Sequence, residues 1–231
     1  IDNLILDLRY NSGGSVNSAI LISSLITGQF TNQIFSTEQW NSEIQNYWLN
    51  NDPEYLINRF VSNANSLSLN RVFIITSRSS ASASELVINC LKPYIDVVQI
   101  GTTTYGKFQA SVTLYDSPDF STNGINSSHT YALQPLVLKT LNSQGLTDYY
   151  NGLSPDVLVE ENSANLGIIG DIGEPLLSVA LELINTDRRN SIFNEEIEFI
   201  GDSNSLNILD KEMYISIENY IKFGKSYERK K

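Results

Sequence analysis

The chain is organised around the stretch RVFIITSRSSASASELVINCLKPYIDVVQI, residues 71–100. Its first part, Arg71–Thr76, is apolar and β-branched, which predicts a buried strand. Residues 84–91 carry apolar side chains at helical spacing and end before Pro93. Residues 95–100 are again apolar and β-branched. A strand, a helix and another strand in this order predict an α/β fold with a largely parallel sheet and flanking helices.

A similar unit precedes this stretch. Residues 3–9 predict a buried strand, and Asn11-Ser12-Gly13-Gly14 predicts a turn whose glycines permit positive φ. Apolar side chains over residues 16–25 then recur at helical spacing. Residues 30–69 differ, because they are rich in Asn, Gln and aromatic residues, with weak helical periodicity over 54–61. We interpret 30–69 as an insertion or lid whose aromatic side chains pack onto the core. A substrate-binding platform is the alternative.

Downstream of residue 107 the pattern changes to longer strands and wider loops. The sequence predicts strands over 110–115 and 130–140, a polar loop between them, a short strand up to Glu160 and a helix over 174–184. Beyond it, a strand near Ile197 and a helix over 205–223 are expected. We therefore expect a main core over residues 1–187 and a C-terminal extension over 188–231.

Composition limits the possible partners. A chain of 231 residues with 41% hydrophobic residues can bury one sizeable core. Fifteen basic residues against 26 acidic ones give a net charge of −11, so no nucleic acid partner is expected. Cys90 is the sole cysteine, which excludes an intrachain disulfide, and it is predicted to be buried.

The ends and hydropathy of the chain also carry expectations. No stretch reaches the roughly 18 consecutive apolar residues that a membrane-spanning helix requires, so no integral membrane segment is expected. The chain begins abruptly inside a predicted strand. We therefore expect it to be a fragment that lacks an N-terminal part, including any export signal.

Two segments carry the residues for covalent catalysis. A run of small hydroxyl residues, SSASASE at 79–85, opens the central helix, and Lys107 ends the Gly-flanked loop 101–107. A serine hydroxyl needs a nearby base, and burial can lower the pKa of a lysine by about 3 to 5 units. At a helix start, free first-turn amides and the helix dipole favour a developing negative charge, which makes the amide of Ala83 a candidate oxyanion donor. The turn at Gly13 and Gly14 is the best source of a second donor. These arguments leave open which of the serines Ser80, Ser82 and Ser84 is the nucleophile.

Four motifs together identify a family. They are DLRYNSGG at 7–14, SASASE at 80–85, TYGK at 104–107 and GLSPD at 152–156, and they follow one another in the order found in the C-terminal processing peptidases, also called tail-specific proteases. The chain resembles this family over roughly residues 2–160. The resemblance implies a crotonase/Clp-protease-like core.

The resemblance also implies roles for particular residues. It makes Ser82 the nucleophile and Lys107 the base of a Ser/Lys dyad, with Gly14 and Ala83 donating to the oxyanion. It implies a serine endopeptidase that cuts protein or peptide substrates near their C-termini through an acyl-enzyme, without a metal or organic cofactor. Export to a bacterial periplasm or cell envelope is implied too. The peptide-recognition PDZ module that often precedes the core in this family is not found in this chain, which leaves two alternatives: it belongs to a missing part of the same protein, or this branch of the family never had one.

The sequence departs from the family at one functional position. Where many members carry a glutamine that orients the lysine, this chain has Ser111, with Gln109 close by. Either residue is a candidate for that role. Glu85 is interpreted as a first-turn helix acid with a possible supporting role at the site.

Two other functions remain as alternatives. A catalytically silent binding module on the same fold, for a hydrophobic ligand or a peptide, is the runner-up, although retention of Ser82 and Lys107 argues against it. A Ser-His-Asp hydrolase would have to use His129, the sole histidine, which lies in a polar loop and is interpreted as a surface residue.

Overall fold

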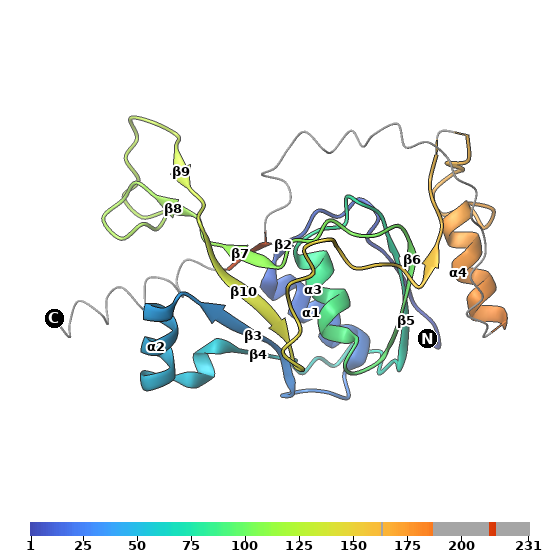
Figure 1. Ribbon diagram of the computed structural model, residues 1–231, viewed down its shortest axis with the longest axis horizontal. Coiled ribbons are helices and arrows are strands. Elements are labelled where there is room, and N and C mark those ends of the chain that lie inside the picture. The colour runs from blue at the N-terminus through green and yellow to red at the C-terminus, as the bar shows by residue number, and fades with distance from the viewer. Residues whose placement is uncertain (163, 187–212, 216–231) are drawn as a thin grey trace.

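The computed structural model of the protein describes residues 1–162, 164–186 and 213–215. A four-stranded parallel sheet and a six-stranded mixed sheet enclose the helices α1 (Val16–Thr27) and α3 (Ala83–Leu91) between them (Figure 1). Every residue of α3 is buried, so this helix is the centre of the molecule.

The parallel sheet has the order β1 (Ile5–Asp7), β5 (Arg71–Thr76), β6 (Asp96–Gly101) and β11 (Val157–Leu158). Side chains alternate between its two faces, as the pleat of a strand requires. Val72 and Ile74 of β5 belong to the main core around α1 and α3. Phe73 and Ile75 point the other way, into a second core completed by α4 (Pro175–Thr186). The parallel sheet is therefore covered by helices on both faces.

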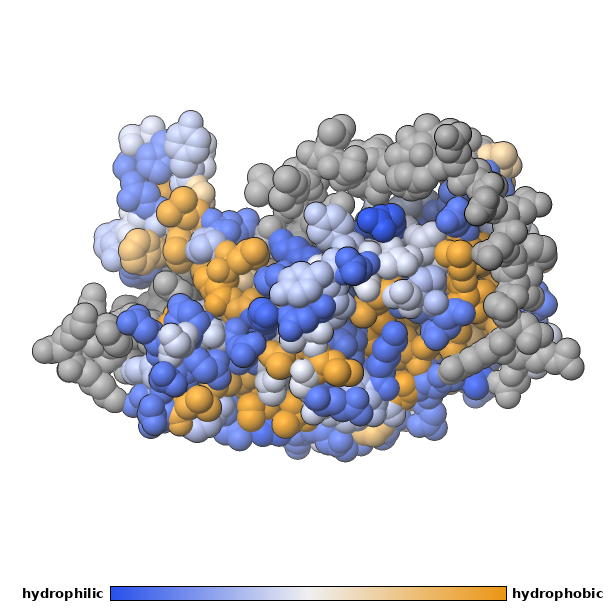
Figure 2. Space-filling model, in the orientation of Figure 1, coloured by the Kyte–Doolittle hydropathy of each residue, from blue (hydrophilic) through white to orange (hydrophobic). Residues whose placement is uncertain are grey.

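The mixed sheet lies on the other side of α1 and α3. Its order is β2 (Gly14–Ser15), β12 (Met213–Tyr214), β7 (Gln109–Ser111), β10 (Leu136–Asn142), β3 (Ile34–Trp40) and β4 (Ile57–Arg59). The small hairpin β8 (Leu114–Tyr115) and β9 (Ala132–Leu133) projects from this side of the molecule (Figure 1). On the face shown in Figure 2, hydrophilic side chains predominate and hydrophobic groups lie between them.

The structure confirms the predicted strand, helix and strand at the centre of the sequence. β5 has the predicted bounds, α3 begins one residue earlier than predicted, and β6 is shifted by one residue at both ends. The strand before the glycine turn, helix α1, the short strand β11 and helix α4 are present as well. These are the segments whose apolar pattern decides the element, because both faces of the parallel sheet and all of α3 are buried.

Three local predictions are wrong. The strands expected over 110–115 and 130–140 are each broken, and Pro135, which has no amide to donate to a ladder, separates β9 from β10. The weak helical pattern over 54–61 resolves into a short 3-10 helix, η1 (Pro53–Leu56), followed by β4. β4 pairs with β3 in antiparallel register, and this pairing overrides a weak local preference.

Residues 30–69 contain β3, α2 (Ser42–Asn51), η1 and β4. Their large aromatic residues are packed: Trp40, Trp48 and Phe60 are buried in the main core, and the ring of Trp48 stacks on that of Tyr55 at 3.7 Å. This packing is what we expected of the aromatic side chains. The division into a core over 1–187, with an insertion or lid over 30–69, stays a prediction.

Most of the predicted C-terminal extension, 188–231, lies outside the described residues, including the strand expected near Ile197. Residues 213–215 are described, and there the expected helix is wrong, because Met213–Tyr214 form strand β12 inside the mixed sheet. None of the helices in the described part of the chain is long and apolar enough to cross a bilayer.

Candidate active site

The glycine turn of residues 11–14 packs directly on the serine turn that opens α3. The carbonyl of Asn11 accepts hydrogen bonds from the amide of Ala81 at 3.2 Å and the hydroxyl of Ser84 at 2.9 Å. A Cβ on Gly13 would lie 2.7 Å from the Cβ of Ser82, and the φ of Gly13 is 116°. Only glycine fits here, because both the space and the backbone conformation exclude a side chain.

Ser82 has an unusual backbone conformation and an unusual side-chain environment. It immediately precedes α3, with φ 61° and ψ −115°, a region that non-glycine residues rarely adopt. Such strain persists only where the surroundings enforce it, and it concentrates at functional sites. The Ser82 hydroxyl is buried, faces the first-turn amides of α3 and donates to no acceptor. A buried hydroxyl that donates to nothing costs free energy and is open to an incoming group.

The structure also distinguishes Ser82 from its two neighbouring candidates. The Ser80 hydroxyl donates to the carbonyl of Leu8 at 2.6 Å, and the Ser84 hydroxyl donates to Asn11. Both hydroxyls therefore hold the serine turn against the end of β1 and the glycine turn. Of the three, Ser82 alone has a hydroxyl that donates to no acceptor.

Glu85 connects the serine turn to the loop that carries Lys107. Its carboxylate is fully buried and accepts four hydrogen bonds. Oε2 accepts from the backbone amides of Ser82 and Lys107, each at 2.8 Å. Oε1 accepts from the hydroxyl of Thr104 at 2.5 Å and the amide of Gly106 at 2.7 Å. The amide nitrogens of Ser82 and Lys107 can therefore be no farther apart than twice their distance to the shared oxygen.

The environment of Glu85 affects its ionisation in two opposing ways. Burial disfavours the charged carboxylate and raises the pKa of Glu85 above its usual value, while the hydrogen bonds from Thr104 and the backbone amides oppose this rise. All four partners are donors, so they fit the ionised form, which only accepts. The sequence predicts Glu85 as a first-turn helix acid, which it is. That its carboxylate also bonds to the loop of Lys107 could be seen only in the tertiary structure.

The fourth motif, at 152–156, supports the loop of Lys107 from the other side. The amide of Leu153 donates to the hydroxyl of Thr104 at 2.7 Å, and the amide of Thr104 donates to the carbonyl of Leu153. Gly106 and Gly152 lie so close to backbone atoms that a Cβ on either would clash at 2.4 Å or less. Asp156 then holds the amide of Gln99 on β6. All four motifs of the sequence thus meet around the start of α3.

The remaining predicted site residues lie around the same place. Lys107 is half-buried just before β7. Ala83 is the first residue of α3, where backbone amides have no acceptor within the helix, and a Cβ on Gly13 would lie 3.0 Å from its nitrogen. Gly14 has a φ of 131° and begins β2. Their catalytic roles stay predictions.

Gln109 and Ser111, the two candidates for orienting the lysine, are both in β7. Gln109 is half-buried at the start of the strand. The Ser111 hydroxyl is buried and donates to the carbonyl of Met213 at 3.0 Å. It accepts a hydrogen bond from the side-chain Nε2 of Gln134 at 3.2 Å. This hydroxyl is therefore engaged with β12.

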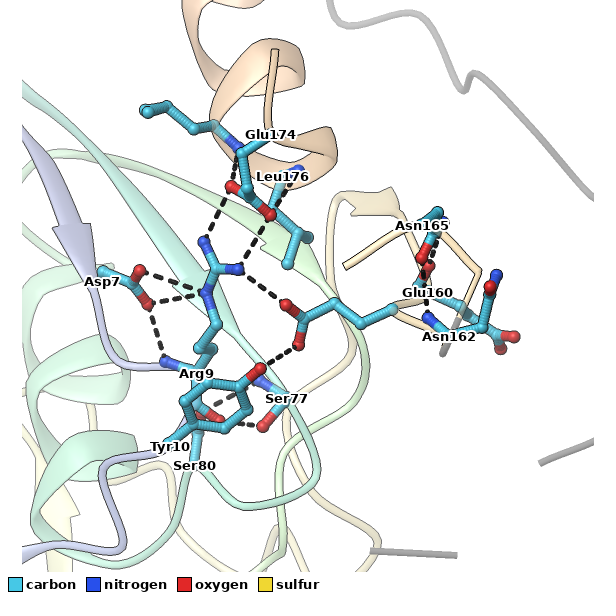
Figure 3. Close-up of polar contacts among 12 residues, drawn as sticks. Asp7, Arg9, Tyr10, Ser77, Ser80, Glu160, Asn162, Asn165, Glu174 and Leu176 are labelled. Atoms are coloured by element: carbon cyan, nitrogen blue, oxygen red, sulfur yellow. Dashed lines mark hydrogen bonds and ion pairs between the residues drawn. The ribbon is translucent and has the colours of Figure 1, made fainter. Parts of the chain in front are cut away.

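A buried ion-pair cluster anchors the strand that leads into the glycine turn (Figure 3). The guanidinium of Arg9, 2% exposed, pairs with Glu174 through both terminal nitrogens, at 2.8 and 3.0 Å. It also pairs with Asp7 at 3.1 Å and Glu161 at 2.7 Å, and Tyr10 donates to Glu161. We call Asp7, Arg9, Glu161 and Glu174 the Arg9 cluster. Asp7 and Arg9 therefore hold the chain next to the glycine turn.

Ionisation in the Arg9 cluster follows from these contacts. Burial of Glu174 favours its neutral form, but the bonds from Arg9 and from the amides of Leu177 and Leu176 outweigh burial and lower the pKa of Glu174. Burial and the bond to Glu161 raise the pKa of Tyr10 to about 12. The sequence alone contained no signal that the distant Glu161 and Glu174 would join Arg9.

His129 does not take part in this arrangement. Its ring bonds to Asp116 at 3.1 Å and to the amide of Tyr131, on the projecting hairpin. Cys90 is fully buried in α3, as predicted, and burial raises the pKa of its thiol. Within the described ranges, no group of three His, Cys, Asp or Glu side chains could hold a metal ion.

The family model of peptidase family S41 matches residues 1–159, and the chain belongs to this family. Members of this family are serine peptidases with a Ser/Lys dyad. The resemblance to the C-terminal processing peptidases is thereby confirmed, and the chain contains an S41 peptidase domain. No curated protein sequence matches the chain.

Solved structures show the same fold. A candidate S41 protease from Bacteroides fragilis is 26% identical, with a TM-score of 0.65, over 81% of this chain and 46% of that chain. A candidate peptidase from Parabacteroides merdae, 17% identical, has a TM-score of 0.54 over 83% of this chain and 55% of that chain. A Streptococcus agalactiae lipoprotein, also 17% identical, has a TM-score of 0.50 over 80% of this chain and 55% of that chain. The predicted fold class is confirmed, and the chain spans about half the length of these proteins.

Proposed function

We propose that this chain is the catalytic part of a serine endopeptidase of the C-terminal processing type, with Ser82 as nucleophile and Lys107 as general base. The observation that carries the proposal is Ser82 itself. Its strained backbone, at the start of a fully buried helix, presents a buried hydroxyl that donates to no acceptor. Strained strand-to-helix turns of this kind expose nucleophilic serines in other hydrolases.

The proposed reaction has two halves. The neutral amine of Lys107 takes the proton of the Ser82 hydroxyl while Oγ attacks the peptide carbonyl. The amides of Gly14 and Ala83 stabilise the oxyanion, and the amine of the leaving peptide takes the proton from Lys107 as the C–N bond breaks. A water molecule, deprotonated by the same lysine, then hydrolyses the acyl-enzyme and regenerates Ser82.

The role of Glu85 in this mechanism is positional. Its carboxylate bonds to the backbone on both sides of the dyad, at Ser82 and at Lys107, and so holds two separate loops at one distance. Enzymes lose activity steeply when reacting groups move by about 1 Å. Gln109 and Ser111 remain our candidates for orienting the amine of Lys107.

The test is cleavage of a denatured protein such as casein by the purified chain. Ser82→Ala and Lys107→Ala should each lower the rate at least about a hundredfold, as loss of a nucleophile or general base does. Ser23→Ala is the matched serine control, because its hydroxyl is also buried without a partner, in α1. Lys92→Ala, at an exposed position at the end of α3, is the matched lysine control.

The outcomes separate the candidate functions. Cleavage that survives Ser82→Ala or Lys107→Ala would refute the dyad. A folded chain that binds peptides but cleaves none, alone or within a longer protein, would favour the silent binding module.

We further propose, from the family resemblance, that the substrates are proteins cut near their C-termini and that the protein is exported to a bacterial periplasm or cell envelope. Cleavage products of a tagged substrate, mapped by mass spectrometry, test the first point. Fractionation of cells that make the natural protein tests the second. Internal cuts without preference for the C-terminal region, or a cytoplasmic location, would refute them.

A further inference from the structure

The C-terminal strand β12 occupies a position next to the proposed catalytic residues. It lies between β2 and β7 and runs parallel to both. Met213 is in register with Gly14 on one side and Ala110 on the other. The amide of Ile215 donates to the carbonyl of Ser111 at 3.0 Å, and the Ser111 hydroxyl donates to the carbonyl of Met213.

The two strands beside β12 both lead out of the candidate active site. β2 begins at Gly14, the proposed oxyanion donor, and the preceding Gly13 touches Ser82. β7 begins just after Lys107 and Phe108. A backbone that runs between β2 and β7 therefore passes the point where the carbonyl of a substrate would have to lie.

Proteins commonly bind extended peptides by adding them as a strand to a sheet. Main-chain hydrogen bonds then give affinity for any sequence, and alternate side chains enter pockets that give specificity. The three residues of β12 and its end show this alternation. Met213 is fully buried in the main core, Tyr214 is 45% exposed, and Ile215 is buried again at 7%.

We propose that the gap between β2 and β7 is the binding site for the extended substrate peptide, and that Met213, Tyr214 and Ile215 fill it as an internal competitor. The inference rests on the proposed peptidase function. It gives the substrate strand a direction, parallel to β2 and β7, and a preference for an apolar side chain such as Met opposite Gly14. The position opposite Ser15 accepts many side chains, because Tyr214 there is half-exposed.

A tethered competitor hides the site from free peptides, because it is present at a high effective concentration. Weakening β12 should therefore open the site. Ile215→Pro removes the amide that bonds to Ser111 and alters no residue of β2 or β7.

The first experiment measures peptide binding in a Ser82→Ala background, where no cleavage occurs. The probe is a fluorescent peptide that copies residues 210–218, DKEMYISIE, measured by fluorescence anisotropy. The Ile215→Pro chain should bind it at least about tenfold more tightly than the chain with Ile215 does. A control peptide with Asp in place of the Met should bind to neither chain. Equal binding of the probe by both chains, or of both peptides, overturns the proposal.

The second experiment does not depend on a weakened strand. Ser15→Cys and Tyr214→Cys place cysteines at partner positions of β2 and β12, and a short bismaleimide can join them. Cys90 is fully buried and out of reach of the reagent. The crosslinked chain should lose peptide binding and peptidase activity about tenfold or more relative to the same double-cysteine chain without the reagent, whereas the Tyr214→Cys chain treated alike should keep both.

Full activity and binding after crosslinking would show that β12 is a permanent part of the sheet, and the proposal would fail. The two proposals can fail separately. Cleavage that persists in Ser82→Ala would refute the dyad, whereas the binding measurements are independent of the identity of the nucleophile.

Discussion

Two buried charges lie near the serine turn, and they are satisfied in different ways. Glu85 is fully buried, and its partners are neutral: three backbone amides and one hydroxyl. Arg9 is also buried, and its partners are the carboxylates of Asp7, Glu161 and Glu174. Because Glu85 bonds to backbone amides, it holds the main chain of two segments in place. Arg9 pairs with carboxylates, so it holds together side chains that come from separate elements.

The comparison assigns the two groups different tasks. Glu85 holds the loop of Lys107 against the turn of Ser82, so its loss should disturb catalysis more than folding. The Arg9 cluster joins β1 to Glu174, the residue before α4, as Figure 3 shows. It also pairs with Glu161 in the loop after β11, so its loss should disturb folding more than catalysis. The predictions that follow test this division.

Arg9→Ala should have the largest effect on stability. Removing the guanidinium leaves the fully buried Glu174 without its partner, and breaking a buried pair in this way costs about 3–5 kcal/mol. The free energy of unfolding from urea denaturation is the measurement. Arg59→Ala is the matched control, because Arg59 pairs with an exposed carboxylate, Glu54, and should cost about 1 kcal/mol or less. Equal losses in the two variants would contradict a supporting role of the Arg9 cluster.

Glu85→Gln should have a smaller effect on stability, about 1–3 kcal/mol, because one oxygen becomes an amide donor that faces other donors. Its effect on catalysis should be larger than that of any Arg9 cluster variant that folds, with kcat lower by about tenfold or more. Steady-state cleavage measures this loss. Glu38→Gln, another buried carboxylate that accepts from Trp40 and Asn58, is the control that should keep kcat. If both variants lose kcat equally, Glu85 has no special positional role.

The pH dependence of stability should show the smallest effect. The pKa of Glu174 is lowered in the folded chain, so its contribution is complete above the unfolded value of about 4.3 and is lost as the pH falls through the folded pKa. The stability difference between the unaltered chain and Glu174→Gln should therefore shrink on acidification. The pKa of Glu85 is raised in the folded chain, so its protonation on acidification favours the folded state. The stability difference between the unaltered chain and Glu85→Gln should therefore grow as the pH falls. Urea denaturation at pH 7 and pH 4 measures both, and parallel behaviour of the two variants would contradict the comparison.

Much of the fold could be predicted from the sequence where local pattern and burial agree. Arg71–Thr76 is a strand because its β-branched residues face two cores, and α3 follows it because its apolar residues recur at helical spacing. The failures are at 54–61, 110–140 and 213–215, where sheet pairing or a proline decides the element. Such pairings join residues far apart in the sequence, which a local pattern cannot contain.

The sequence by itself determined the chemical groups and the family, since four short motifs in order contain the serines, the lysine and the glycines. Only the tertiary structure decided how these groups are used. In it, the hydroxyls of Ser80 and Ser84 donate to backbone carbonyls, whereas that of Ser82 donates to no acceptor. It also placed β12 beside Gly14. The physical reason is that hydrogen-bond partners and strand neighbours are set by the packing of distant segments, which must satisfy each buried polar group.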